Sequence, residues 1–369
     1  MLKSLFEAGI NAVFGENTVQ DALLRLPLAS PVHVLAIGKA AASMMQGTVR
    51  ANIEFETALL ITKNGHVDRS KFAPDIEIME AAHPLPDQSS LEAGARLLQW
   101  IKALPQNSTL LFLVSGGASS LVEVLVPTAT VDQLVSLNKK AMAQGLEIGE
   151  INKQRSAISA IKGGKLLSHF GGRQVCTLYI SDVRNDAIQT VGSGIGASPL
   201  AANFVYECHV VGSNALARDK IVLAAQDQNI HVVENEGLLF DDVTALAPML
   251  ARRVLEGPAG LYVWGGESTV QLPQVPGVGG RNQSLGLLFA KEIAGQSGIN
   301  GLFTGTDGTD GPTPFAGALV NGSTFFAQPG AQTALDTADS STYLKKCGAI
   351  FETGPTGTNV MDLALVFKD

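Results

Sequence analysis

The residues with the clearest chemical potential form a glycine-rich stretch, residues 305–322, which begins Gly305-Thr306-Asp307-Gly308-Thr309-Asp310-Gly311-Pro312. Its glycines allow positive φ and a close approach of the backbone to a ligand. Asp307 and Asp310 supply hard oxygen ligands of the kind that Mg²⁺ prefers. The apolar run Ile299–Phe303 predicts a buried strand before the loop, and open α/β sheets bind ligands at strand carboxyl ends. The alternative is a surface turn, since Gly, Asp and Thr are common turn formers.

Two other predicted strands also end in glycine turns with chemically useful groups. Residues 32–45, VHVLAIGKAAASMM, predict a strand, a turn at Gly38 and a helix whose first turn carries Lys39. A cation at that position opposes the helix dipole, and breaking a local rule at a strand end favours a functional role over simple solvation. Residues 109–121 repeat the pattern with Ser115-Gly116-Gly117, whose amides at a helix start would form an anion site.

Residues 131–148 and 151–168 predict two consecutive helices. In the second helix, polar and basic residues recur at three- and four-residue spacing and therefore share one face: Asn152, Arg155, Ser159 and Lys162. A solvated face is one interpretation of this pattern, and a stripe that faces phosphate is the other.

Two further predicted strands place charged residues at their ends. Residues 174–183 predict a strand with Asp182 at its carboxyl end. Residues 260–269 predict a strand that ends at Gly265-Gly266-Glu267, and the glycine-rich loop after it holds Arg281 just before a helix. Together with Lys39, Arg281 gives two cations at predicted strand ends.

Length and composition bound the class of protein. The chain has 369 residues, enough for two domains, and 46% apolar with 16% charged residues is typical of a globular protein. A net charge of −8 argues against a nucleic-acid-binding surface. No apolar run approaches the ~20 residues of a membrane-spanning helix, and the N-terminus resembles neither a secretory signal nor a transit peptide. Three widely spaced cysteines and no metal-spaced histidines indicate a reducing, cytoplasmic location and no zinc site.

The order of predicted elements indicates an α/β fold with two α/β domains. Two series of alternating strands and helices flank a Gly/Ser-rich loop, GSGIGASP over residues 192–199, which is typical of a connection between domains. Glycine-bearing loops gather at the strand ends in both series. That number of loops exceeds what packing requires and suggests a polyphosphate held by backbone amides.

Phosphoryl transfer needs cations on the transferring oxygens, a metal on the phosphates and a group that orients the acceptor hydroxyl. Lys39 and Arg281 are the candidate cations, Asp307 and Asp310 the candidate metal ligands, and Asp182 the candidate base. No phosphate-loop motif of the Gly-x₄-Gly-Lys type is present, so the nucleotide would have to be bound in another way.

Other chemistries find less support. Hydride transfer needs a dinucleotide fingerprint, and no Gly-x-Gly-x-x-Gly follows the first predicted strand. Hydrolysis by a Ser-His-Asp triad would call for a Gly-x-Ser-x-Gly elbow. The Gly-Ser-Gly at 192–194 is not such an elbow, because it follows its strand through a long irregular loop.

Short motifs occur along nearly the whole chain: IGKAAASMM (37–45), ITKNGH (61–66), HPLPD (83–87), SGGASSL (115–121), NKQRSAISAIKGGKL (152–166), SDV (181–183), GGEST (265–269), GGRNQ (279–283), GTDGTDGP (305–312) and TGPTGTNVMDL (353–363). In these motifs the chain resembles the glycerate 2-kinases that carry a C-terminal MOFRL domain and are often mislabelled hydroxypyruvate reductases. The combination of the last three motifs is specific to that family.

The resemblance implies ATP- and Mg²⁺-dependent phosphorylation of D-glycerate at its 2-hydroxyl, giving 2-phosphoglycerate. It implies a Rossmann-like N-terminal domain over residues 1–203 and a smaller α/β MOFRL domain over residues 204–369. The active site would lie in the interdomain cleft, with the last segment packing back on the first domain. The family's suspected catalytic pair falls on Lys39 and Arg281, and both motifs are intact here.

Two departures from the family pattern bear on the base assignment more than on the reaction class. After Ser181-Asp182-Val183 the family usually has Pro-Gly-Asp, whereas this chain has Arg184-Asn185-Asp186. A Ser-Gly-Pro is usual further on, where this chain has GSGIGASP. The chain is also shorter than typical members.

The resulting hypothesis gives each candidate a role. Lys39 and Arg281 would neutralise charge on the γ-phosphoryl group, Asp182 would receive or orient the hydroxyl proton, and Asp307 and Asp310 would hold Mg²⁺ or position the nucleotide. The remaining candidates would bind substrate or phosphate: Ser115, Gly116, Gly117, Arg155, Lys162, Glu267 and Asn282.

Two other functions stay open at this point. One is an NAD(P)H-dependent hydroxypyruvate reductase, against which the missing fingerprint argues. The other is a nucleotide-binding protein without turnover, against which the intact Lys39 and Arg281 argue. The expected partners are small-molecule substrates, D-glycerate and ATP, with no nucleic acid and no membrane. A homodimer is one possibility for the oligomeric state.

Overall fold

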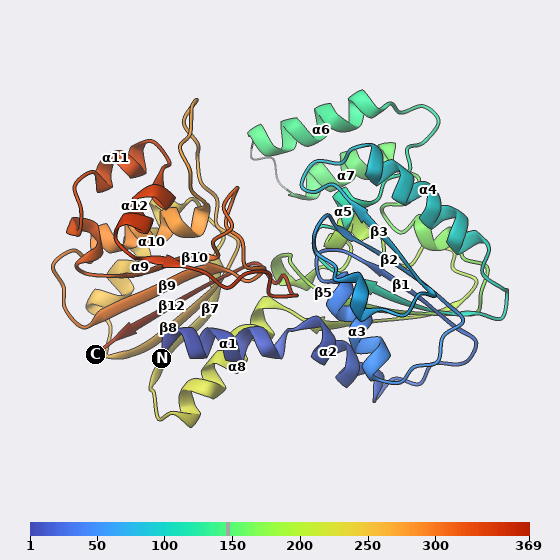
Figure 1. Cartoon of the computed structure of the whole chain (residues 1–369), viewed down its shortest axis with the longest axis horizontal. Coiled ribbons are helices and arrows are strands. Elements are labelled where there is room, and N and C mark those ends of the chain that lie inside the picture. Colours follow the sequence, from blue (N-terminus) through green and yellow to red (C-terminus); the bar gives the residue numbers. More distant parts are fainter. Residues whose placement is uncertain (145–147) are drawn as a thin grey trace. The chain divides into compact units, whose positions relative to one another are not determined.

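The computed structural model describes residues 1–144 and 148–369, with the side chains of residues 138–152 excluded (Figure 1). The described chain forms two compact units. The N-terminal unit comprises Phe14–Ser213 and Gly357–Asn359. The C-terminal unit comprises Met1–Val13, Asn214–Thr356 and Val360–Asp369. These segments do not coincide with the expected domains 1–203 and 204–369. The first helix belongs to the C-terminal unit, and the strand at 205–212 belongs to the N-terminal unit.

The N-terminal unit is built on a six-stranded sheet with the order β3-β2-β1-β4-β5-β6, and all its strand pairs are parallel. This is the strand order of Rossmann-type folds. The predicted Rossmann-like α/β class is therefore confirmed. The strands are β1 Val32–Ile37, β2 Thr57–Lys63, β3 Ile76–Ala81, β4 Thr109–Val114, β5 Gln174–Ile180 and β6 Val205–Gly212.

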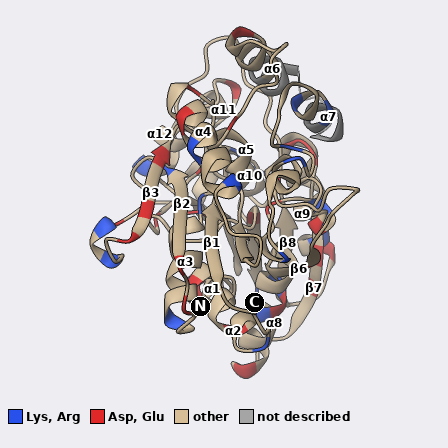
Figure 2. Cartoon of the chain, turned by 90° about the vertical axis from the view of Figure 1, so that its right-hand side faces the viewer, with Lys and Arg blue, Asp and Glu red and all other residues tan. Residues whose placement is uncertain are grey.

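The central strands of this sheet are apolar because both of its faces are covered. All residues of β1 and β4 are buried, and β1 carries no Lys, Arg, Asp or Glu (Figure 2). The edge strand β3 instead carries Glu77 and Glu80, as expected where an unpaired edge must resist further strand pairing (Figure 2). The helices of the unit are α2 Gly15–Leu23, α3 Ala41–Arg50, α4 Gln88–Lys102, α5 Ala118–Leu121, α6 Val131–Gln144 and α7 Ile148–Ile158.

The predictions for the last two of these helices are only partly right. Of the predicted helix 131–148, residues 145–147 lie outside the described part of the chain. The predicted helix 151–168 is wrong in its second half, since α7 ends at Ile158. The chain there pairs antiparallel with an upstream segment, because the amide of Ala160 donates to the carbonyl of Val124 (2.7 Å) and the amide of Val126 donates to that of Ile158 (3.0 Å). Ser159 and Lys162 are therefore not on the face of a helix.

The C-terminal unit is built on a six-stranded mixed sheet with the order β11-β10-β9-β12-β8-β7. Strands β10 and β12 both run antiparallel to β9, whereas β7 and β8 are parallel. The helices α1 Leu2–Ala12 and α8 Asn214–Asp227 contact each other, and α9 Val243–Glu256 contacts α10 Arg281–Glu292 (Figure 1). The remaining elements are β7 Val232–Leu239, β8 Gly260–Gly266, β9 Ile299–Gly305, β10 Gly317–Asn321, α11 Ala331–Asp336, α12 Ser340–Lys346, β11 Ile350–Phe351 and β12 Asp362–Lys368.

Helix α1 belongs to the C-terminal unit through close packing. A Cβ on Gly9 would lie 2.8 Å from the side chain of Ile221 and 3.0 Å from the carbonyl of Ala217 on α8, so the two helices meet where Gly9 lacks a side chain. Leu5 and Phe6 are buried beside it. No helix among the described residues is long and apolar enough to cross a membrane.

Gly94 provides a test of the packing in the N-terminal unit. It lies inside α4, where alanine would be favoured by about 1 kcal/mol on helix propensity alone. A Cβ at this position would, however, lie 2.1 Å from the carbonyl oxygen of Glu123. We expect Gly94→Ala to lower the midpoint of thermal unfolding, because the backbone must shift at a cost of about 1–3 kcal/mol.

The matched control is Gly171→Ala, since no atom lies within 4 Å of the added Cβ and the residue is exposed. Its midpoint should equal or slightly exceed that of the wild type. A Gly94→Ala protein as stable as the Gly171→Ala protein would contradict the observed contact between α4 and Glu123.

Candidate functional site

Three loops of the N-terminal unit meet at the carboxyl ends of β1, β4 and β5, which are neighbours in the sheet. The amide of Lys39, after β1, donates to the carbonyl of Gly116, after β4 (2.9 Å). The amide of Ala40 donates to the side chain of the buried Ser115 (3.1 Å). The strand order reverses between β1 and β4, and in open α/β sheets ligands bind at such a switch point. The predicted positions of Lys39 and Ser115–Gly117 thus converge.

Glycines are required here because side chains from the neighbouring loops fill the space. Gly38 has φ of +131°, and a Cβ there would lie 2.1 Å from the Ser115 hydroxyl oxygen. A Cβ on Gly116 would lie 2.0 Å from Oδ2 of Asp182. Asp182, which follows β5, is therefore packed directly against the backbone of the loop after β4. Its Oδ2 also accepts a hydrogen bond from Nδ2 of Asn359 (3.4 Å).

Two residues of this site, His83 and Asn359, were not among the predicted site residues. A Cβ on Gly117 would lie 3.1 Å from Cδ2 of His83 and 3.2 Å from Cγ of Lys39, so these side chains border the same glycine. His83 follows β3, and Asn359 comes from the short C-terminal segment that groups with this unit. Their motifs, HPLPD and GPTGTN, carried the family resemblance, and that was the only signal that could have identified them.

Lys162 has a different environment from the one predicted. Its ammonium forms an ion pair with Glu123, and the side chains are 1% and 0% exposed. Ser159 donates to Oε1 of the same carboxylate (2.6 Å). Burial lowers the pKa of Lys162, while the charge of Glu123 opposes this shift. Because the ammonium is buried against Glu123, the structure does not present Lys162 to a substrate carboxylate as we had predicted.

Arg155 is the more accessible cation of this region. Its side chain is half-buried at the end of α7, and burial lowers its pKa while the charge of Glu123 raises it. Glu123 thus forms an ion pair with Lys162 and also lies near enough to Arg155 for its charge to act on the guanidinium. The side chain of Asn152, the other polar residue of the predicted stripe, lies outside the described residues.

In the C-terminal unit, Arg281 is the first residue of α10 and binds two carboxylates. Its Nε and Nη2 donate to Asp362 (2.6 and 3.0 Å), and its Nη1 donates to Glu267 (2.8 Å). Burial opposes the charge of the guanidinium, but these two carboxylates raise the pKa of Arg281 overall. Asp362, at the start of β12, was not predicted as part of the site, although the quoted motif TGPTGTNVMDL contains it.

Asp310 was predicted as a metal ligand, and its environment argues against that role. Its Oδ2 accepts from the amide of Gln283 (2.8 Å), and its Oδ1 accepts from the amide of Asn282 (3.1 Å) and from the Asn282 side chain (3.3 Å). The carboxylate is 2% exposed and stabilises the otherwise unpaired amides at the start of α10. Asp310 is therefore engaged in holding α10, and Asn282 in holding Asp310.

Asp307 is the better placed of the two predicted metal ligands. It is half-buried, and its Oδ1 accepts from the amide and hydroxyl of Thr309 (both 2.9 Å), which fixes the turn. No group of three or more His, Cys, Asp and Glu side chains within the described residues could hold a metal ion. Mg²⁺ commonly takes one or two protein carboxylates together with substrate phosphates, and Asp307 fits that mode of binding.

The arrangement defines a class of protein: two α/β units whose glycine-rich loops hold cations and carboxylates at the carboxyl ends of strands. Residues 1–203 match the domain of unknown function DUF4147, and residues 260–362 match the MOFRL family. The DUF4147 match covers more than half of the 369 residues. The chain therefore belongs to the DUF4147 family and carries a MOFRL segment, which confirms the predicted resemblance.

Named relatives match along nearly the full chain. A D-glycerate 2-kinase from Thermotoga maritima is 31% identical over 98% of this chain and 96% of its own length. A protein from Agrobacterium vitis, provisionally named a hydroxypyruvate reductase, is 29% identical over 99% of this chain and 93% of its own length. The crystal structure of a glycerate kinase from T. maritima superposes with a TM-score of 0.87 and 29% identity, covering 99% of this chain and 98% of that one.

Substitution of Gly116 tests the contact between the loop after β4 and Asp182. A Cβ would overlap the carboxylate, so Gly116→Ala should displace Asp182 and disturb the loop amides together. Because a shift of about 1 Å in a reacting group can cost about 10²-fold in rate, we expect a loss of that order in kcat/KM. The control, Gly171→Ala, should retain the wild-type kcat/KM. If Gly116→Ala also retained it, Asp182 would have no part in the reaction.

The burial of Asp310 predicts a pH dependence of stability. Burial, aided by the charge of Asp362, raises the pKa of Asp310 from 3.8 to about 6, against the opposing effects of the Gln283 and Asn282 amides and of Arg281. Between pH 3.8 and about 6, Asp310 keeps its proton in the folded protein but releases it in the unfolded chain. The stability linked to this proton is fully present below the unfolded-state pKa of 3.8 and is lost as the pH rises through about 6.

The measurement is the free energy of unfolding at about pH 5 and about pH 7.5 for the wild type and Asp310→Asn. The variant lacks this titration, so the wild type should lose about 1 kcal/mol more than the variant over that interval. Equal pH dependence in the two proteins would show that Asp310 titrates normally.

Proposed function

We propose that this protein is a glycerate 2-kinase, which transfers a phosphoryl group from ATP to the 2-hydroxyl of D-glycerate and forms 2-phosphoglycerate and ADP. The observation that carries the proposal is the convergence of Lys39, Ser115–Gly117 and Asp182 at the switch point of a Rossmann-type sheet. This convergence occurs in a chain that matches a D-glycerate 2-kinase over 98% of its length. The family's own motifs thus fall where open α/β sheets bind ligands.

The N-terminal unit would bind and activate glycerate. Asp182 would accept or orient the proton of the 2-hydroxyl, with Asn359 donating to one of its oxygens and so fixing the carboxylate. The amides of Ser115–Gly117 and the cation of Arg155 would bind the glycerate carboxylate. In this proposal Lys162 acts indirectly, because its ion pair with Glu123 positions that carboxylate beside Arg155.

Charge on the transferring phosphoryl group would be neutralised by Lys39 and Arg281. Three of the five N–H donors of Arg281 bind Asp362 and Glu267, which leaves two for phosphate oxygens. The guanidinium is held in place before the phosphoryl group arrives, and its side chain remains 33% exposed. A positioned arginine of this kind can contribute about 10³–10⁵ in rate to phosphoryl transfer.

The nucleotide and metal assignments are part of the same proposal. ATP would be the donor, and Asp307 would hold Mg²⁺ together with its phosphates, which supplies further positive charge to the phosphate oxygens. Glu267 would orient Arg281, and Asn282 would fix Asp310 at the start of α10. We further propose a cytoplasmic location, with a homodimer to be tested by sedimentation.

A hydroxypyruvate reductase is the second candidate, because a relative carries that name and the strand order is of the Rossmann type. The turn after β1, where a dinucleotide fold places its phosphate-binding glycines, reads Gly38-Lys39-Ala40 here. The side chain of Lys39 and the methyl group of Ala40 stand where that fingerprint needs glycine for close backbone approach. The local sequence therefore favours the kinase.

The test is ATP turnover with D-glycerate, with the product identified as the 2- or the 3-phosphate. We expect 2-phosphoglycerate from the wild type, and a loss of at least about 10³-fold in kcat for Lys39→Ala and for Arg281→Lys. The lysine variant keeps the charge of Arg281 but loses its two-pronged bond to Asp362.

Inertness toward D-glycerate would remove the proposed function. Near-normal rates in both variants would remove the catalytic roles alone. Oxidation of NADH with hydroxypyruvate as substrate would support the second candidate, and binding of ATP without any turnover would indicate a non-catalytic nucleotide-binding protein.

A further inference from the structure

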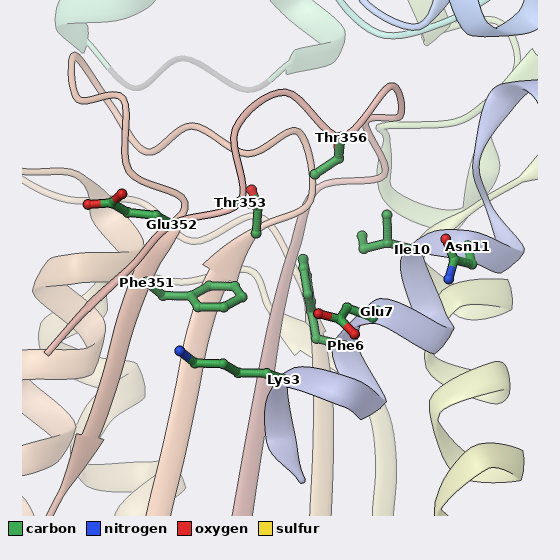
Figure 3. A pocket seen from close by; sticks show the side chains of 9 residues that line it. All are labelled: Lys3, Phe6, Glu7, Ile10, Asn11, Phe351, Glu352, Thr353 and Thr356. Carbon is green, nitrogen blue, oxygen red and sulfur yellow. The ribbon is translucent and has the colours of Figure 1, made fainter.

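The two sheets have four edge strands, and three of these carry features that oppose pairing with a further strand. Strand β3 carries two glutamates, each in an ion pair. Strand β7 carries Glu234 and Glu236 and has two shifts in its register with β8. Strand β11 consists only of Ile350 and Phe351, and the ring of Phe351 packs edge to face against Phe6 of α1, with centroids 5.4 Å apart (Figure 3). Each of these devices is a common protection of a sheet edge.

Strand β6, the fourth edge strand, lacks these protections. Its eight residues, VYECHVVG, include no Lys, Arg or Pro, and its single shift in register comes after Val210. Val205 is 62% exposed, and the side chains of Glu207 and His209, on the same face of the strand, are also exposed. Among the described residues, only β5 pairs with this strand. The outer edge of β6 is therefore open to pairing with a further strand.

The backbone of β6 presents unpaired groups along that edge. The amide of Val205 donates to the carbonyl of Arg173, at the start of β5 (2.9 Å). Successive residues of a strand direct their amides and carbonyls to opposite sides, so those of Tyr206, Cys208 and Val210 point away from β5. No described residue forms a hydrogen bond with these outward amides and carbonyls. A partner strand would satisfy donors and acceptors that this chain leaves unpaired.

Two-fold symmetry restricts how a second copy of β6 can pair with the first. In an antiparallel pair related by a two-fold axis, the axis passes through one residue position, and residues equally far from it on either side lie opposite each other. An axis at Cys208 pairs the outward groups of all three residues, with Tyr206 opposite Val210 of the partner subunit. Any other position of the axis pairs fewer of these groups within the strand. An axis at Glu207 would also set two carboxylates opposite each other, which destabilises a sheet.

The side chains of the exposed face are complementary in the same register. With the axis at Cys208, Glu207 lies opposite His209 of the partner subunit, and the reciprocal pair forms on the other side of the axis. A carboxylate can accept a hydrogen bond from an imidazole or form an ion pair with it, and such cross-strand pairs stabilise a sheet. Backbone and side chains therefore select the same occupant of this edge, a second copy of the strand.

We propose that β6 pairs antiparallel with β6 of a second copy of this chain, about a two-fold axis at Cys208, and so joins the sheets of two N-terminal units into one continuous sheet. Main-chain hydrogen bonds provide the affinity, and the Glu207–His209 pairs fix the register. The inference specifies the surface that forms the proposed homodimer. It is independent of the kinase function, because strand pairing requires no substrate.

The experiment is analytical sedimentation of the full-length chain over a wide range of protein concentration, without substrate. We expect a concentration-dependent dimer in the wild type. His209→Glu places two carboxylates across each pair and should raise the dimer dissociation constant at least about tenfold. The double variant Glu207→Lys/His209→Glu again opposes unlike charges and should return the constant to near the wild-type value. The control, His231→Glu, makes the same change at an exposed histidine outside β6 and should leave the constant unchanged.

Cross-linking through Cys208 tests the position of the axis. The Cα atoms of two opposed residues in a hydrogen-bonded pair lie about 5.5 Å apart, within reach of a short reagent that joins two thiols. The wild type should therefore yield a covalent dimer, and Cys208→Ser, which retains Cys176 and Cys347, should not.

Three results would overturn the proposed pairing. They are a wild type that stays monomeric or gives no covalent dimer, a dimer that His209→Glu leaves unchanged, and a covalent dimer that persists in Cys208→Ser. A wild type that meets every expectation yet does not phosphorylate D-glycerate would refute the kinase function and support the interface.

Discussion

The N-terminal site depends on one backbone hydrogen bond, from the amide of Lys39 to the carbonyl of Gly116. This bond joins the loops after β1 and β4 where the strand order reverses. It can form only because Gly38 leaves room for Ser115 and Gly116 leaves room for Asp182. A cation and a carboxylate that follow strands distant in sequence are thereby brought to the same edge of the sheet by backbone contacts. Lys39 lies two residues before α3 and not in its first turn, where the sequence predicted it, yet it is still close to the end of the helix where a cation is unfavourable.

The C-terminal unit positions its charges by ion pairs and helix capping instead. Two carboxylates, Asp362 and Glu267, hold Arg281, and a third, Asp310, holds the start of α10. The three carboxylates are held by these hydrogen bonds and ion pairs against Arg281 and the first amides of α10. They also weaken the field of the guanidinium, since two negative charges lie against one positive charge. Arg281 alone would then stabilise a phosphoryl group poorly, and the proposed reaction needs the separate charges of Lys39 and of a metal ion.

Sequence patterns located the loops better than they located the partners of each side chain. Lys39, Ser115–Gly117 and Asp182 could be predicted because apolar runs mark strands and glycine marks the turn that follows them. Lys162 could not be placed, because periodicity does not reveal that Ala160 pairs with Val124 and ends the helix early. Composition likewise cannot separate a carboxylate that binds metal from one that caps a helix, and therefore could not show that Asp310 accepts the first amides of α10. His83, Asn359 and Asp362 come from distant segments, and only the folded chain brings them to their sites.

The two positioning strategies give the units different sensitivities. In the N-terminal unit, the backbone of one loop packs against the side chains of the next, so that site does not tolerate an added methyl group on Gly38 or Gly116. In the C-terminal unit, a buried carboxylate with a pKa of about 6 lies within one hydrogen-bond network with the residues that follow Arg281, so protonation acts on the start of α10. In a phosphoryl-transfer enzyme built from both units, protonation of Asp310 would therefore act directly beside Arg281, at the start of α10.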